Sequence, residues 1–289
     1  MAAAQKYWLN NLSNAAANGS YRHGHYVEAP ENWDLVRDQI VEYFQRAHAD
    51  ARARLTALAS NSLHPAGTPP PPYDQYPFGL PQVTLQGYFG EILAGYLAET
   101  VAPAGHSDWR VPAHLFRFHL QAFQFLEQRS QSGHGPSAIV GRTGDDCLAF
   151  RRNGSGEIIA VLFCEAKCTT SHAAALIRDA HEKVSASEIV DILQLVEILK
   201  DSPAPDAADW IMSLQVFHMR LHSTVRHTHQ RHDLVCYVHR SVPKQNKTWI
   251  PTDRPHEAYT ASRGLDVYEV RLTDVAARLL SIYSEENWR

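Results

Sequence analysis

The chain lacks the features that define several large classes of protein. It has 4 cysteines among 289 residues, without the two matched pairs of a zinc site, so free thiols in a reducing compartment are expected. No apolar run is long enough to span a bilayer, and the first residues have no apolar signal-peptide core, which predicts a cytoplasmic protein. There is no GxxxxGK[ST] loop for binding ATP and no GxSxG elbow for serine-hydrolase chemistry.

A surplus of basic residues is also missing. Lys and Arg number 27 against 31 Asp and Glu, a formal net charge of −4, whereas a free-standing nucleic-acid-binding protein usually carries excess positive charge. A hydrophobic content of 44% and a charged content of 20% describe an ordinary globular protein. Its length suits one large domain or a core with an appended segment.

An acidic and a basic residue stand together at the end of an apolar run. Residues 147–150 and 158–164 are short apolar runs typical of buried strands, and the Asn-Gly-Ser-Gly sequence at 153–156 predicts a hairpin between them. Glu165 and Lys167 follow the second run directly. Because side chains alternate along a strand, both are expected on the same face.

This combination fits metal-dependent phosphodiester hydrolysis. Asp146 directly precedes the first run, and strand pairing can bring it beside Glu165; Asp145 is the alternative, since sequence determines register only weakly. These carboxylates and the backbone carbonyl of Ala166 are oxygen ligands of the kind that Mg²⁺ prefers, with Mn²⁺ as the alternative ion. Lys167 can hold the attacking water and stabilise negative charge as it develops.

The pattern resembles the PD-(D/E)XK nuclease superfamily, which has the restriction-endonuclease-like fold. The residues that match by identity are Asp146 and Glu165-Ala166-Lys167, and the resemblance covers roughly residues 82–283 in the order of elements. It implies an α/β protein with a mixed central sheet flanked by helices. Asp145 rather than a proline precedes Asp146, a departure that many members of the superfamily share.

A helix upstream supplies a further carboxylate. Its apolar residues have helical spacing, at positions 85, 88, 89, 92, 93, 96 and 97. Glu91 lies beside this stripe, and the superfamily commonly has a helix before the core sheet that contributes a Glu to the metal site. The resemblance therefore implies Glu91 as a third carboxylate, with Glu99 at the helix end as the weaker candidate. The alternative is that Glu91 only lies at the rim of a packed helix.

Local patches are the candidates for contact with nucleic acid. Residues 218–239 carry six of the chain's 17 histidines. We expect residues 211–221 to form a strand that leads into an exposed loop contacting phosphate or a partner, with plain solvated surface as an alternative. The full set of candidate contacts is Arg142, Arg151, Arg152, His227 and His229. A further alternative is a different phosphodiesterase, in which Mn²⁺ or Zn²⁺ is bound by His227, His229 and His232.

The rest of the chain divides coarsely. Residues 32–60 predict a helix, residues 64–73 form a proline-rich connector, and residues 1–30 show no clear core pattern and are interpreted as an arm or interface element. We thus expect an N-terminal helical segment and connector over residues 1–72 and a nuclease-like domain over residues 73–289.

The resemblance also implies a function and partners. We expect a Mg²⁺-dependent nuclease acting on DNA, with RNA as the alternative substrate. The absence of a motor or a sequence-reading motif favours an effector in prokaryotic antiviral defence, acting beside an ATPase, helicase or sensor subunit, and self-association is left open; this step is analogy. The competing hypothesis is a catalytically inactive nuclease fold that serves as a nucleic-acid-binding or scaffold subunit.

Overall fold

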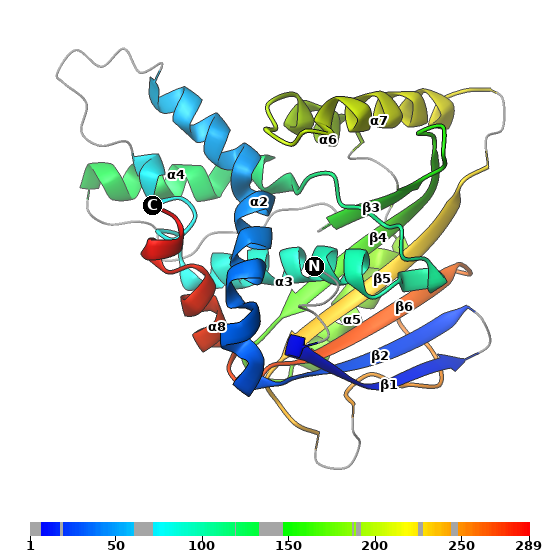
Figure 1. Ribbon diagram of the computed structural model, residues 1–289. Helices are drawn as coiled ribbons and strands as arrows, with labels where there is room; N and C mark the ends of the chain where they lie inside the picture. Colours follow the sequence, from blue (N-terminus) through cyan, green and yellow to red (C-terminus); the bar gives the residue numbers. More distant parts are fainter. Residues whose placement is uncertain are drawn as a thin grey trace.

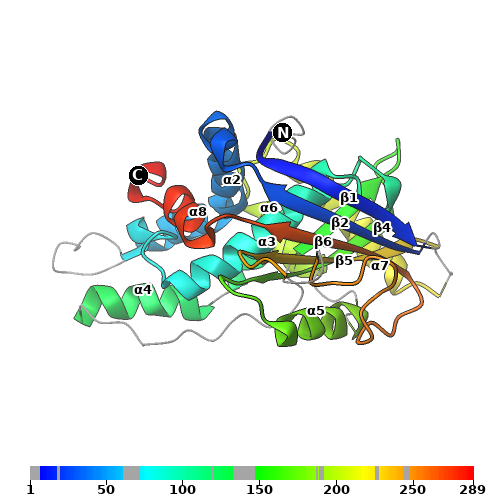
Figure 2. The same cartoon turned by 90° about the horizontal axis from the view of Figure 1, so that it is seen from below.

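A computed structural model describes residues 7–17, 20–60, 72–118, 120–132, 147–186, 188, 192–224, 228–243 and 248–289. The centre of the protein is a six-stranded sheet in the order β1-β2-β6-β5-β4-β3, with helices on both faces (Figures 1 and 2). The expected α/β class with a mixed, helix-flanked sheet is therefore confirmed.

The sheet combines a parallel centre with antiparallel edges. Strands β2, β6, β5 and β4 are parallel to one another, whereas β1 pairs antiparallel with β2, and β3 antiparallel with β4. The central strands are largely buried on both faces, as expected where helices cover a sheet on both sides. The strand bounds are β1 (Leu9–Ala17), β2 (Tyr21–Glu28), β3 (Cys147–Arg152), β4 (Ile158–Cys168), β5 (Gln230–His239) and β6 (Gly264–Arg271).

Two hydrophobic clusters lie on opposite sides of the sheet, and each has its own helices. One side, here called the α3 face, is covered by α2 (Trp33–Ser60), α3 (Gln82–Thr100), α4 (Leu120–Ser132) and α8 (Val275–Ile282). The other side, the α5 face, is covered by α5 (Ala174–Ala186), α6 (Ile192–Lys200) and α7 (Ala207–Leu221). The connections include short 3₁₀ helices, η1 (Pro30–Asn32), η2 (Pro72–Gln75), η3 (Pro103–Gly105), η4 (Leu115–Phe118) and η5 (Glu285–Asn287).

The interpretation of the first thirty residues as an arm is wrong. β1 and β2 extend the sheet, and β2 pairs with β6 along its length. The inward positions of β2 include His23 and His25, which are buried polar residues. Apolar alternation, the usual signature of a strand, is therefore absent from this segment. The N-terminal segment thus contributes strands as well as the long helix α2, while the proline-rich connector lies mostly outside the described residues.

The strand expected over residues 211–221 is also wrong, because this segment belongs to helix α7. The large buried side chains of α7, Trp210, Leu214 and Phe217, are spaced by four and three residues, which is the period of a helix packed on one side. An exposed methionine, Met219, also entered the apparent alternation.

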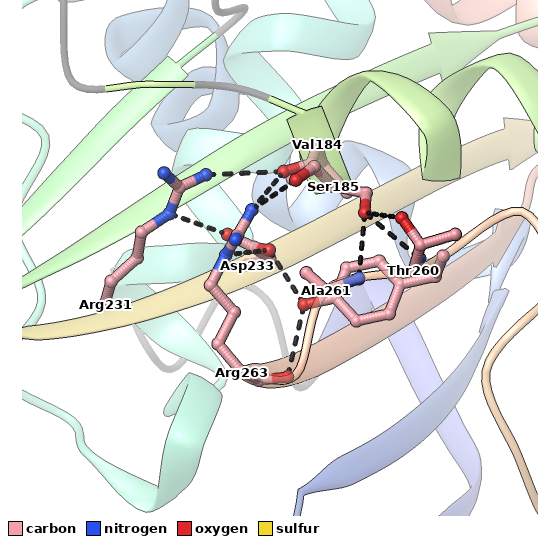
Figure 3. Close-up of polar contacts among 8 residues, drawn as sticks. Val184, Ser185, Arg231, Asp233, Thr260, Ala261 and Arg263 are labelled. Atoms are coloured by element: carbon pink, nitrogen blue, oxygen red, sulfur yellow. Dashed lines mark hydrogen bonds and ion pairs between the residues drawn. The ribbon is translucent and has the colours of Figure 1, made fainter.

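A buried ion-pair cluster attaches the segment after β5 to the end of α5 (Figure 3). The side chain of Asp233 is fully buried and accepts hydrogen bonds from Arg231 Nε at 3.2 Å, Arg263 Nε at 2.7 Å and the Tyr259 hydroxyl at 2.8 Å. Arg263 also donates to the backbone carbonyl of Val184 at 2.8 Å. The arginines thereby join β5, α5 and the segment before β6.

The same segment is held at its other end by a second buried carboxylate. Glu269 of β6 accepts the backbone N–H groups of Trp249 and Ile250 at 2.9 and 3.1 Å and lies 3.2 Å from His239 Nε2. Burial acts to raise the pKa of Glu269, but the neighbouring His23 and the hydrogen bonds with His239 and from the Trp249 N–H outweigh it and bring the pKa to about 2. Glu269 is thus ionised at neutral pH.

In the described part of the chain, no helix combines the length and apolar character needed to cross a membrane.

Candidate active site

The Glu-x-Lys sequence lies at the end of β4, which pairs with β5 on one side and with the edge strand β3 on the other. Val161 and Phe163 pack on the α5 face, whereas Leu162 and Ala166 belong to the cluster on the α3 face. Continued alternation places Glu165 and Lys167 on the α5 face. Both residues contact side chains of α5, which agrees with this placement. The strand geometry therefore presents the carboxylate and the ammonium on the same face.

Two side chains of α5 complete a cluster of four charged groups. Lys167 Nζ lies 2.6 Å from Glu165 Oε1 and 2.9 Å from Asp179 Oδ2. Lys183 Nζ lies 3.4 Å from Glu165 Oε1 and 3.7 Å from Asp179 Oδ2. Asp179 and Lys183 are four residues apart on the helix and so lie on the same side of it. Among the described residues, the contacts thus join two acidic and two basic side chains.

The cluster is closed toward the sheet and open toward solvent. The side chains of Glu165 and Lys167 are 4% and 14% exposed, whereas those of Asp179 and Lys183 are 47% and 49% exposed. Partial burial acts to raise the pKa of Asp179, but the hydrogen bond from Lys167 and the charges of both lysines outweigh it, so the pKa lies below its usual value. Water and ions can reach the cluster from the α5 side.

The backbone direction of β4 also bears on the site. The Thr169 N–H donates to the Val238 carbonyl of β5 at 2.9 Å. Because successive residues of a strand direct their backbone groups to opposite sides, Cys168 and Ala166 direct theirs away from β5. The Gln86 side chain donates to the Cys168 carbonyl at 2.6 Å, which agrees with this direction. The Ala166 carbonyl therefore lies on the β3 side of β4.

The predicted aspartate ligand lies outside the described residues, as do Asp145 and Arg142. The described part of β3 begins at Cys147, which pairs with Cys164. Cys147 directly follows Asp146 in the chain, and Cys164 directly precedes Glu165. Whether Asp146 or Asp145 completes the site thus stays a prediction.

Glu91 lies on α3, which covers the opposite face of the sheet from Glu165. A Cβ atom added to the neighbouring Gly90 would lie 3.1 Å from the Cβ of Cys168 and 3.7 Å from the Cβ of Ala166, so α3 crosses directly over this end of β4. Burial chiefly raises the pKa of Tyr283 in the same layer, and the charge of Glu91 adds to the effect. The structure thus places Glu91 on the helix over the α3 face of the sheet, and its role as a third carboxylate stays a prediction.

Glu99, the weaker helical candidate, makes contacts that stabilise the fold. Its carboxylate accepts the Val111 N–H at 2.9 Å and lies 3.4 Å from Arg46 Nη2. Burial raises the pKa of Glu99 above its usual value. This residue attaches the last turn of α3 to the following segment.

Arg151 and Arg152 do not flank Glu165, because they lie at the hairpin end of β3. Arg151 Nε pairs with Asp108 at 2.6 Å, and the Arg152 guanidinium lies 3.8 Å from the ring centre of Trp210. From this end of the hairpin, Glu165 is some six strand residues away, or roughly 20 Å. The two arginines also take separate environments, one beside η3 and one against α7.

Arg151 and His229 line the same cavity, of about 510 Å³, at this end of the sheet. The other lining residues are His106, Ile159, Thr228 and Gln230. Burial and the charge of Arg231 lower the pKa of His229 below its usual value, so its ring is mainly neutral at pH 7. His227 lies outside the described residues. A role of this cavity in binding nucleic acid stays a prediction.

Sequence reasoning missed Asp179 and Lys183. The signal available to it was an acidic and a basic residue with i,i+4 spacing in the helix that directly follows Glu-x-Lys. Nothing in that spacing determines which side of the helix packs on the sheet, so their contact with Glu165 depends on tertiary packing.

The ligands available at this site are of the kind that a hard divalent ion prefers. The described residues supply the Glu165 carboxylate and the Ala166 carbonyl, both oxygen donors. Among the residues that the structure describes, no three His, Cys, Asp or Glu side chains form a group that could hold a metal. A complete ligand set thus requires the aspartate that precedes β3.

Comparisons with protein-family models and with curated proteins found no match to this chain.

Proposed function

We propose that this protein is a metal-dependent nuclease of the PD-(D/E)XK type. The observation that supports the proposal best is the joint emergence of Glu165 and Lys167 on one face at the end of β4, in a cluster that is buried below and open to solvent above. A structural ion pair has no need of the open side. Phosphodiester hydrolysis does, because substrate and water must reach the buried carboxylate and ammonium.

The proposal assigns a role to each residue. Asp146, Glu165 and the Ala166 carbonyl bind Mg²⁺ or Mn²⁺, which when bound acidifies a water and neutralises phosphate charge. Lys167 orients the attacking water and stabilises the charge that develops on phosphorus oxygens. Asp179 holds the Lys167 ammonium in place from α5. Side chains of β3 alternate so that Leu148 and Phe150 face α5, and the proposal requires Asp146 to follow that alternation.

DNA is the proposed substrate, and an effector role in prokaryotic defence beside an ATPase, helicase or sensor subunit is the proposed setting. Both rest on the resemblance of the Glu165-Ala166-Lys167 region to the superfamily. The net charge of −4 supports dependence on a partner, since the chain has no general electrostatic attraction for nucleic acid.

A non-catalytic scaffold is the second candidate, and one observation favours it. Each carboxylate of the cluster already lies near two ammonium groups, so the four described charges are balanced without a metal. Balanced clusters of this kind also occur as structural ion pairs. Metal binding distinguishes the two candidates, because a scaffold gains nothing from it.

The test is cleavage of plasmid and linear DNA with Mg²⁺ or Mn²⁺. Wild type is compared with Lys167→Ala and Asp146→Ala, and with Lys200→Ala as a matched control, since Lys200 is half exposed on α6 and pairs with the exposed Glu197. We expect slow cleavage by wild type and the control in the absence of a partner, and loss of this cleavage in both site variants, with folding intact. Cleavage that survives in Lys167→Ala would contradict the proposal.

Calorimetric titration with Mn²⁺ supplies a readout that needs no partner. We expect one ion bound by wild type and a weaker interaction in Asp146→Ala and Glu165→Gln. Equal binding by all three would place the ion elsewhere and leave the scaffold as the better account. Rapid, unrestrained degradation of DNA by the protein alone would contradict the dependence on a partner but not the nuclease.

A further inference from the structure

The last turn of α7 carries two histidines with the spacing that places side chains on one side of a helix. His218 and His222 are four residues apart, and the centres of their rings lie 4.6 Å apart at an interplanar angle of 66°. His222 is exposed and His218 is half-buried. Residues at positions i and i+4 are neighbours on a helix surface, so the two imidazoles form a pair that is open to solvent.

The separation of the rings matches that of two imidazoles sharing one metal ion. An ion at about 2.1 Å from a ring nitrogen lies roughly 3.2 Å from the ring centre. Two rings bound at tetrahedral or square-planar angles then have centres roughly 4.5 to 5.2 Å apart. The observed 4.6 Å falls within this range, so rotation of the side chains suffices to direct one nitrogen of each ring at a common point.

Two other histidines of the described chain, His181 and His239, are held by contacts of their own. The ring of His181 is buried on α5 and donates through Nδ1 to the Ile177 carbonyl at 2.7 Å. His239 lies against Glu269, whose carboxylate also accepts backbone N–H groups. By contrast, no hydrogen bond joins His218 or His222 to another described residue. Their rings contact each other, and the ring of the exposed His222 is accessible to solvent.

The local charges do not oppose a cation at this place. Arg220 lies between the two histidines in sequence but forms an ion pair with Glu157 of the hairpin before β4. His222 is the C-cap residue of α7, and the C-terminal end of a helix attracts positive charge. A bound ion would therefore add to the stability of the last turn.

We propose that His218 and His222 bind one transition-metal ion of borderline softness, Zn²⁺, Cu²⁺ or Ni²⁺, with water completing its coordination. Imidazole nitrogen suits these ions, whereas Mg²⁺ requires oxygen ligands. The site is separate from the one at Glu165: it lies on a different helix, has nitrogen ligands and does not depend on the proposed nuclease activity.

Calorimetric titration with Zn²⁺ in the presence of excess Mg²⁺ tests this site. We expect His218→Ala and His222→Ala each to bind one ion fewer than wild type, or to bind it at least about tenfold more weakly, because one of two ligand bonds is lost. Mg²⁺ should not displace the ion. Circular dichroism of each variant checks that α7 is retained.

A double substitution provides the matched control. His222→Ala combined with Met219→His keeps the number of histidines but places them at adjacent positions, about 100° apart around the helix. Met219 is 63% exposed, so the change should not disturb packing. We expect this variant to lose the ion as the single variants do. Binding equal to that of wild type, or displacement of Zn²⁺ by Mg²⁺, would overturn the proposal.

Discussion

Two buried carboxylates on the α5 face, Asp233 on β5 and Glu165 on β4, have similar surroundings but differ in how firmly their basic partners are held. Each lies beside two basic side chains, and the two strands are neighbours in the sheet. Asp233 is bound by two arginines, whose rigid guanidinium groups also donate to backbone carbonyls at the end of α5. Every partner in that cluster is thus tied to a second element of the fold.

The cluster around Glu165 has lysines in place of arginines. An ammonium on a flexible chain can exchange one partner for another, and Lys183 and Asp179 are about half exposed. Burial and charge alone therefore do not mark a functional site, since both clusters have them. What separates the two is whether the partners can move aside for water, metal or substrate.

The largest expected effect is a loss of stability when the cluster around Asp233, here called the closed cluster, is disrupted. Replacing Asp233 with alanine leaves Arg231 and Arg263 without their carboxylate and breaks the attachment of α5 to the segment before β6. We expect Asp233→Ala to lower the free energy of unfolding by about 3 kcal/mol or more, measured by urea denaturation. Asp253→Ala is the control, because Asp253 and Arg254 form an exposed pair worth well under about 1 kcal/mol. A similar small loss in both variants would remove the distinction between the clusters.

The next largest effect is a loss of activity when the cluster around Glu165, here called the open cluster, is changed. Glu165→Gln keeps the shape of the side chain but removes the charge that we propose binds a metal. We expect at least about a hundredfold loss in the rate of DNA cleavage, or roughly 3 kcal/mol of transition-state stabilisation. Lys167 keeps Asp179 as a partner, so the free energy of unfolding should change by only about 1 kcal/mol. If Glu165→Gln were as unstable as Asp233→Ala and still cleaved DNA, Glu165 would contribute to stability rather than to cleavage, which would contradict this expectation.

The sequence pattern predicted the two residues that β4 contributes to the cluster around Glu165, but not the two that α5 contributes. The alternation of side chains along residues 158–167 predicted that Glu165 and Lys167 share a face, and the contacts to α5 agree. Asp179 and Lys183 were not predicted, since their position depends on how α5 packs over β4. The β2 strand was missed for a related reason: His23 is buried beside Glu269, a partner that comes from the far end of the chain.

A smaller effect is expected from the carboxylate on the other face. Because Glu91 lies on α3 and the sheet separates the α3 and α5 faces, we expect Glu91→Gln to change the cleavage rate by less than about threefold. The measurement is the same cleavage assay as for Glu165→Gln, normalised to folded protein. A loss as large as that of Glu165→Gln would show that Glu91 reaches the metal after all, as the resemblance to the superfamily implies.

The smallest effect is a pH dependence within the open cluster. Partial burial acts to raise the pKa of Asp179, but Lys167 and, to a smaller extent, Lys183 outweigh it and hold the pKa below its usual value. A lowered pKa in the folded state contributes stability above the unfolded pKa of about 3.8, and this contribution is lost as the pH falls through the folded value. The unfolding free energies of wild type and Asp179→Asn should therefore converge below about pH 4. Solvent screening keeps the difference small, since the Asp179 side chain is 47% exposed. In a Lys167→Met background only Lys183 remains to lower the pKa of Asp179, so the effect of pH should become smaller. An effect of unchanged size there would mean that Lys167 is not its main cause.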